Sequence, residues 1–221
     1  LRVPPPEVVA ELLVTRDGVD PEIAHVAARA AQSHVGVARR LARDPEARER
    51  RSKVLSIPAS IRGVGDAVLA AGELVEIAQA DAKAATADRD AAERAELLRS
   101  LGAEGETRLP PALRAQLTQL EKDQKRRATR VQRDVLDRAM VDLLSLFRDV
   151  LMVQLGAGLE LMNVEHREVV TELAQSSTPE QTLHRMDAIG VARTRLAGNV
   201  APLLAVEAMT LAFRPQVRQL G

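Results

Sequence analysis

The sequence predicts an all-α protein. Period-two alternation of β-branched and aromatic residues is missing, and the helix formers Ala, Leu, Glu, Arg and Gln fill every periodic stretch. Prolines stand near the starts of several expected helices, where a missing amide hydrogen costs little. A chain of 221 residues with 46% hydrophobic and 28% charged residues can bury a substantial core. We therefore expect a folded helical protein, divided into two domains.

The first domain, residues 1–44, is expected to hold three short helices. They are predicted over 5–14, 21–32 and 35–43. Asp20 is the expected cap of the second helix and Ser33 leads the third. Apolar residues three and four positions apart predict one small shared core. These residues are Val8, Leu12, Ile23, Val26, Ala27, Ala30, Val35, Ala38 and Leu41.

The second domain, residues 45–221, should be dominated by two long antiparallel helices. A helix that begins after Asp44 and stops before Pro58 leads into them. The first long helix is expected over 61–101, because small apolar residues there alternate in steps of four and three, as in a heptad pattern. The row consists of Val64, Val68, Ala71, Val75, Ala78, Ala82 and Ala85. After a turn rich in Gly and Pro, the second long helix is expected to reach about Leu155. Three shorter helices are predicted over 164–175, 179–197 and 200–213.

The last of these helices carries a carboxylate in an apolar row. Asn199 is its expected cap, and the row consists of Val200, Leu203, Leu204, Ala208 and Leu211. Glu207 lies on the same stripe, where an unpaired carboxylate is unfavourable. Two interpretations stay open: solvent wets the edge of the stripe, or an arginine pairs with Glu207 inside the fold or across an interface.

A run of charged residues interrupts the second long helix between Glu121 and Asp134. Six basic and three acidic residues lie there, and folding back at the turn would set them beside the acidic residues of 81–96. One interpretation is a solvated hairpin with complementary sides, in which each exposed ion pair contributes little. The other is contact with DNA or an acidic partner. The possible basic contact patch comprises Lys122, Arg126, Arg130 and Arg133.

No motif in the sequence indicates an active site. The absence of cysteine excludes a disulfide scaffold, a thiolate zinc site and a cysteine nucleophile. Phosphate-binding Gly-Lys-Ser/Thr, HExxH and GxSxG motifs are also absent. Phe147 and Phe213 are the only aromatic residues, so the chain lacks a stacking platform for single-stranded nucleic acid. We expect no catalytic residue, metal, cofactor or small-molecule substrate, and no stretch is long and apolar enough to span a membrane.

Three segments carry a resemblance to a known family. The closing segment RLAGNVAPLLAVEAMTLAF resembles the C-terminal helices of collar domains in bacterial clamp loaders. The opening three helices resemble the lid of the same AAA+ proteins, and RRATRVQRDVLDRAMVDLLSLFRDVL is similar to the delta-prime subunits of actinobacterial DNA polymerase III. The resemblance implies an AAA+ lid over 1–44 and a collar over 45–221. It also implies an ATPase-like domain before Leu1.

One position of the lid bears on ATP binding. In ATP-binding clamp-loader subunits the matching helix begins Gly-Ser-x-Arg, and that arginine contacts the γ-phosphate. The matching run here is Ser33-His34-Val35-Gly36, so Gly36 occupies a degenerate sensor-2-like position. The resemblance therefore implies the delta-prime type of subunit, which does not hydrolyse ATP.

The function implied by the resemblance is mechanical. The collar would help hold the pentameric ring of the replicative clamp loader, so that the sliding clamp is loaded on primed DNA. The expected partners are subunits of the gamma/tau and delta types, and DNA is reached through the complex. Asn199 and Glu207 are the expected polar contacts of the collar interface. A cytoplasmic location fits this role and the absence of cysteine.

Three other functions are less well supported by the sequence. A helix-turn-helix transcription regulator with a helical effector domain needs base-reading side chains at the start of its recognition helix, and Val35, Gly36 and Val37 are poor readers. A coiled-coil adaptor needs the heptad row to continue past Ala85, where Arg89 and Glu96 interrupt it. An ATP-hydrolysing clamp-loader subunit is disfavoured by Gly36.

Overall fold

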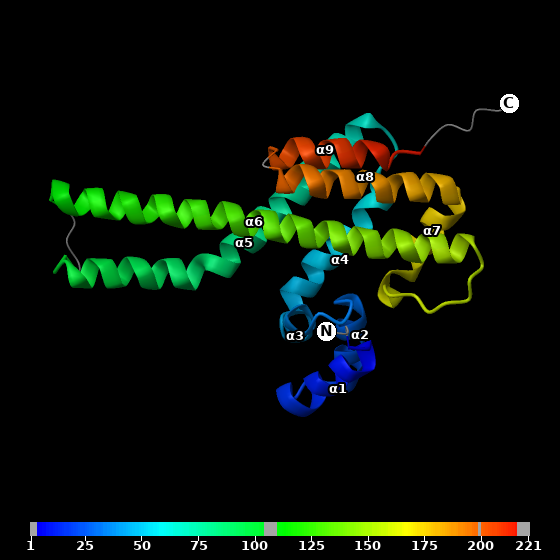
Figure 1. The fold of residues 1–221 in the computed structure, drawn as a ribbon, viewed down its shortest axis with the longest axis horizontal. Coiled ribbons are helices and arrows are strands. Elements are labelled where there is room, and N and C mark those ends of the chain that lie inside the picture. Colours follow the sequence, from blue (N-terminus) through cyan, green and yellow to red (C-terminus); the bar gives the residue numbers. More distant parts are fainter. Residues whose placement is uncertain (1–3, 104–109, 199, 216–221) are drawn as a thin grey trace. The chain divides into compact units, whose positions relative to one another are not determined.

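The computed structural model describes residues 4–103, 110–198 and 200–215, and all regular secondary structure in these residues is helical (Figure 1). The predicted all-α class is confirmed. The chain forms two compact units, one of residues 1–73 with 138–221 and the other of residues 74–137. The predicted division at residue 44 is neither of these boundaries and stays a prediction.

Three short helices open the first unit: α1 (Pro6–Asp17), α2 (Pro21–Ala30) and α3 (Val35–Arg43). Alanines make up most of their shared core, and such small side chains allow short helices to approach closely. The buried residues of this core in the three helices and their links are Val9, Ala10, Leu13, Ala24, Ala27, Ala28, Ala30, Ala31, Ala38, Leu41 and Ala42. The expectation of one small shared core is confirmed.

The buried face of α1 differs from the predicted one. Val9 and Leu13 are buried, whereas Val8 is 51% exposed. In α2, Ile23 and Val26 are likewise exposed and the alanines face inward. Because α1 has adjacent apolar residues on more than one side, spacing alone could not select the face that packs.

Turn geometry explains where the short helices begin and end. Gly18 closes α1 in the left-handed conformation with a φ of 66°, which a glycine adopts without strain. Asp20 caps α2 as predicted by accepting from the amides of Glu22 and Ile23. The prediction that Ser33 leads α3 is wrong, because Ser33 lies in the preceding turn with a φ of 66° and the ring of His34 accepts from the Val37 amide.

The fourth helix, α4 (Pro45–Ser60), runs past the predicted stop at Pro58. Pro58 lies in the last turn, where its missing amide removes only one helical hydrogen bond. It is buried together with Leu55 and Ile57. Tertiary packing therefore outweighs the tendency of proline to end the helix one turn earlier.

Two long helices, α5 (Val64–Ser100) and α6 (Pro111–Gln154), pass through both units. Within the second unit they run antiparallel and side by side, as predicted (Figure 1). The predicted heptad row of α5 is confirmed only in part. Ala71, Ala78 and Ala82 are buried, whereas Val64 and Val68 are exposed.

The first unit is completed by a 3₁₀ turn, η1 (Val164–His166), and by α7 (Arg167–Ser176), α8 (Pro179–Ala197) and α9 (Pro202–Ala212). The predicted range of α8 is confirmed, and a capping box between Thr178 and Gln181 fixes its start. The predicted start of the last helix at Val200 is too early, since Ala201 is the N-cap residue. Asn199, the predicted cap, lies outside the described residues.

The core of the first unit contains both aromatic residues of the chain. Phe147 of α6 and Phe213 after α9 meet edge to face, with ring centroids 5.1 Å apart. The guanidinium of Arg185 on α8 lies over the Phe147 ring, 5.8 Å from its centroid. Burial lowers the pKa of Arg185, and its Nη1 has no hydrogen-bond partner among the described residues. The Phe147 ring thus provides a favourable contact for this buried cation.

Candidate interaction surface

Helix α9 is apolar on two opposite faces. One face packs into the first unit through Ala205, Val206, Met209, Thr210 and Phe213. The other presents Leu203 and Leu204, which are 42% and 61% exposed, together with exposed Ala208 and half-buried Leu211. We call this second set, with Glu207, the α9 stripe. A helix that is apolar all round is normally covered on all sides, whereas no described part of the chain covers the stripe.

The α9 stripe contains the predicted interface residue Glu207. The apolar row that the sequence predicts lies on the exposed side of α9, opposite the face that packs into the first unit. Glu207 is half-buried, and its carboxylate has no hydrogen bond or ion pair among the described residues. An arginine inside the described fold is therefore not its partner.

Helix α8 also exposes large apolar residues. Leu183 and Val191 are 49% and 48% exposed, and Gly190 beside Val191 has open space where a Cβ would lie. α8 and α9 lie next to each other in the fold (Figure 1). Both helices thus add exposed apolar surface to the same end of the chain.

In the second unit, side-chain contacts join the two sides of the helical hairpin, and Arg127 makes several of them. Arg127 Nη2 donates to Asp90 Oδ1 at 2.6 Å and to Glu93 Oε2 at 2.5 Å. Arg89 and Gln124 also donate to Glu93, and these bonds lower the pKa of the Glu93 carboxyl to about 2. A second pair joins Arg94 to Glu121 at 2.9 Å. The interpretation as a hairpin with complementary sides fits these contacts.

The four residues of the predicted basic patch lie along α6 but do not form these bridges. Lys122, Arg126 and Arg130 are exposed, and Arg126 lies 3.6 Å from Asp123 on its own helix. Arg133 is half-buried. The residue that does the pairing, Arg127, was not among the predicted site residues, although it belongs to the same run of charges. Contact of the patch with DNA or an acidic partner stays a prediction.

Replacing Arg127 with alanine is expected to loosen the hairpin. In the wild type, the ionised Glu93 carboxylate that pairs with Arg127 stabilises the hairpin. This stabilisation should be complete above the ordinary glutamate pKa of 4.5 and should disappear as the pH falls toward 2, because the folded state keeps the carboxylate ionised. Amide exchange in the facing parts of α5 and α6 should accelerate in Arg127→Ala and change little in Arg126→Ala, whose side chain is 75% exposed. Equal protection in the two variants would contradict this role.

Gly36 lies in the first turn of α3 and is exposed. A Cβ at this position would meet the ring of His34 at 3.6 Å, which is ordinary van der Waals contact. Packing at the Cβ position therefore does not require glycine there. Its interpretation as a degenerate sensor-2-like position stays a prediction.

The most extensive polar centre of the first unit surrounds Arg51 of α4, which is 7% exposed. Its three nitrogens each bind a different residue: Nε donates to Asp142 at 3.1 Å, Nη1 to Glu165 at 3.1 Å and Nη2 to the Asn163 side chain at 2.5 Å. Burial raises the pKa of the Asp142 carboxyl, and the charge of Arg51 opposes that rise. Every donor nitrogen of this buried cation is therefore satisfied.

Asp149 anchors the other side of the same centre. It is fully buried, and its carboxylate accepts from the backbone amides of Met162 and Asn163 at 3.1 and 2.8 Å. The Asn163 side-chain nitrogen donates to Asp149 at 2.9 Å and to Ser145 at 3.1 Å. The segment before η1 is thus fixed to α6 through Asn163.

Sequence reasoning missed the Arg51 centre. Arg51 stands in a run of charged residues that resembles a solvated helix face, and its partners lie 91 to 114 positions away. One signal was present: Asp142, Ser145 and Asp149 recur at helical spacing within an otherwise apolar part of α6. Such polar residues on a core face require partners.

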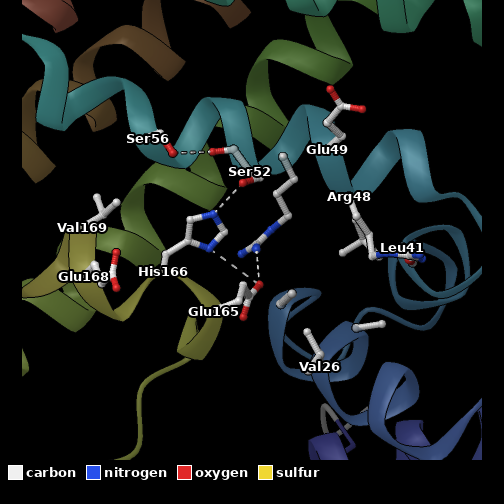
Figure 2. Close-up of a pocket in the computed structure, with 13 residues that line it drawn as sticks. Val26, Leu41, Arg48, Glu49, Ser52, Ser56, Glu165, His166, Glu168 and Val169 are labelled. Atoms are coloured by element: carbon white, nitrogen blue, oxygen red, sulfur yellow. Dashed lines mark hydrogen bonds and ion pairs between the residues drawn. The ribbon is translucent and has the colours of Figure 1, made fainter.

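A cavity of about 600 Å³ adjoins the Arg51 centre (Figure 2). Val26 and Leu41 line it on one side, and Ser52, Glu165 and His166 on the other. Figure 2 shows the ring of His166 between Ser52 and Glu165. Its Nε2 lies 3.0 Å from the Ser52 hydroxyl, while its Nδ1 is buried and lacks a hydrogen-bond partner among the described residues. The polar groups of this wall are engaged mainly with one another.

His166 should make stability depend on pH. Burial lowers its pKa below 6.5, Arg51 lowers it further, and the Glu165 carboxylate acts in the opposite direction. Because the unfolded chain binds the proton more readily, stability should be complete above about pH 6.5 and fall as the pH drops toward the lower pKa of the folded state. Each unit of pKa difference corresponds to about 1.4 kcal/mol.

The variant His166→Gln should remove this pH dependence, measured as the free energy of unfolding between mildly acidic and neutral pH. His184 is exposed, so His184→Gln is the matched control and should retain the wild-type profile. An unchanged profile in His166→Gln would show that another group titrates.

Comparison of the chain with protein-family models, curated proteins and solved structures finds no match. In the part of the chain that the structure describes, no helix has the length and apolar character needed to cross a membrane. Within the same residues, no group of three or more His, Cys, Asp or Glu side chains is placed to hold a metal ion.

Proposed function

We propose that this chain is a structural, non-catalytic subunit of the replicative clamp loader. It helps to hold the pentameric ring, so that the sliding clamp can be loaded on primed DNA. The observation that supports this role is the α9 stripe, an exposed apolar face on a helix whose opposite face is already packed. Subunits held in a ring need such lateral surfaces.

In this proposal, residues 1–44 are the AAA+ lid and residues 45–221 the collar. The resemblance of the closing helices to collar domains concerns the same part of the chain that carries the α9 stripe. The partners are gamma/tau and delta subunits, DNA is engaged through the assembled complex, and the location is cytoplasmic. Gly36 fits a subunit whose lid does not contact a γ-phosphate.

The test is light scattering after size exclusion, with the chain alone and mixed with gamma/tau and delta subunits of the same organism. Refractive index should be followed, because the chain lacks Trp and Tyr. We expect a larger species of fixed stoichiometry in the mixture. If the chain does not bind these subunits but forms a dimer and binds DNA, the result would instead support a function as a transcription regulator.

Leu204→Glu should weaken this association by about tenfold or more, because it places a charge in the apolar stripe. Leu159→Glu is the matched control, since Leu159 is 57% exposed in the segment between α6 and η1. It should leave the association unchanged. Equal weakening by both variants would show that the α9 stripe is not the contact surface.

A further inference from the structure

We propose that the α9 stripe docks against a different polypeptide, and that this partner places an arginine or lysine opposite Glu207. The inference deepens the proposed function, since it specifies the chemistry of the partner that the collar would bind. Three features support it. Glu207 lies between apolar residues of the stripe, its carboxylate would lose solvent on docking, and a second copy of the chain would bring a like charge opposite it.

Glu207 lies at the centre of the stripe. Leu203 is one helical turn before it and Leu211 one turn after it, while Leu204 and Ala208 lie to one side. All five residues are exposed or half-buried, and the opposite face of α9 is buried. A partner that covers Leu203 and Leu211 must therefore also cover the carboxylate between them.

Covering Glu207 without a partner for its charge would oppose binding. Removal of a carboxylate from water is unfavourable unless it is paired and hydrogen-bonded. No hydrogen bond or ion pair joins the Glu207 carboxylate to the described residues of this chain, so none of them supplies that charge. We assign the compensating cation to the molecule that covers the stripe, and a guanidinium is well suited to a carboxylate at an interface.

A second copy of the chain is a poor occupant. A two-fold axis through the centre of the stripe would bring one Glu207 close to the other, and like charges repel. The next basic residue along the chain after Glu207 is Arg214, seven positions later, and its Nε donates to the Leu211 carbonyl at 2.9 Å. Charge complementarity therefore favours a different polypeptide.

The test measures the affinity of gamma/tau and delta subunits for the wild-type chain, Glu207→Gln, Glu207→Lys and Leu204→Glu, each over a series of salt concentrations. We expect Glu207→Gln to weaken binding by about tenfold or more and to reduce its salt dependence, and Glu207→Lys to weaken it further. Glu76→Gln, at an exposed glutamate of α5, is the matched control and should bind as the wild type does.

The outcomes separate this inference from the proposed function. If Leu204→Glu abolishes binding while Glu207→Gln binds equally or more tightly, the proposed function stands and the partner cation is wrong. If the wild type self-associates and Glu207→Gln strengthens that association, the occupant is a second copy. If Leu204→Glu lowers the Tm of the isolated chain, the chain itself covers the stripe, and the inference is overturned. Absence of binding to both subunits overturns the proposed function and this inference together.

Discussion

Arg51→Met is expected to lower the free energy of unfolding by about 3–5 kcal/mol, because it leaves the buried groups around Arg51 without their cation. Asp142 is the most affected, since burial already raises its pKa and the charge of Arg51 most strongly opposes that rise. The side-chain oxygen of Asn163 would lose its closer donor, and Glu165 would lose an ion pair. Denaturant unfolding followed by far-ultraviolet circular dichroism measures the change.

The matched control for this variant is Lys53→Met, two positions along the same helix. Lys53 pairs with Glu49 at 2.8 Å, but both side chains are more than half exposed, so the pair should contribute little to stability. The double variant Arg51→Met with Asp142→Leu should recover part of the loss, because it removes the stranded carboxylate. A loss below about 1 kcal/mol for Arg51→Met alone would refute the view that this centre stabilises the first unit.

Phe147→Ala should cost a similar amount, about 3–5 kcal/mol. Phe147 is fully buried, so the substitution leaves a cavity and removes the edge-to-face contact with Phe213. It also removes the ring that faces the Arg185 guanidinium, which has an unpartnered nitrogen. The same unfolding experiment measures this loss.

Two further variants separate these contributions. Phe147→Leu keeps most of the buried volume and should cost clearly less than the alanine variant. Arg185→Met in the Phe147→Ala background should restore stability relative to Phe147→Ala alone. The buried guanidinium that has lost its contact with the ring is then replaced by an apolar side chain. Strict additivity of the two substitutions would show that Arg185 and Phe147 do not interact.

The elements with strong local signals could be predicted from the sequence. Pro179 marks the start of α8, and Asp20 caps α2, because each signal depends on neighbouring residues alone. The helical class follows in the same way from periodic stretches of helix formers. The predictions that failed depend on tertiary packing, which neighbouring residues in the sequence do not specify. Pro58 stays in its helix because its surroundings bury it.

The sequence could not show which face of α9 packs against the core. Residues on both sides of the helix are apolar, so the hydrophobic periodicity favours neither face. In the structure, the row that contains Glu207 is the exposed one. The sequence identified the carboxylate as anomalous without showing which side of the helix packs. The Arg51 centre was beyond reach because it depends on contacts between α4, α6 and η1 that no local pattern encodes.

The long sequence separations in the Arg51 centre have a consequence for folding kinetics. The bonds from Arg51 close loops of 91, 112 and 114 residues, and such closures carry an entropic cost before they gain contacts. We expect the centre to form after the local helical contacts, late on the folding pathway. Loss of Arg51 should then accelerate unfolding while leaving the folding rate nearly unchanged. The arginine would thereby set the lifetime of the native state.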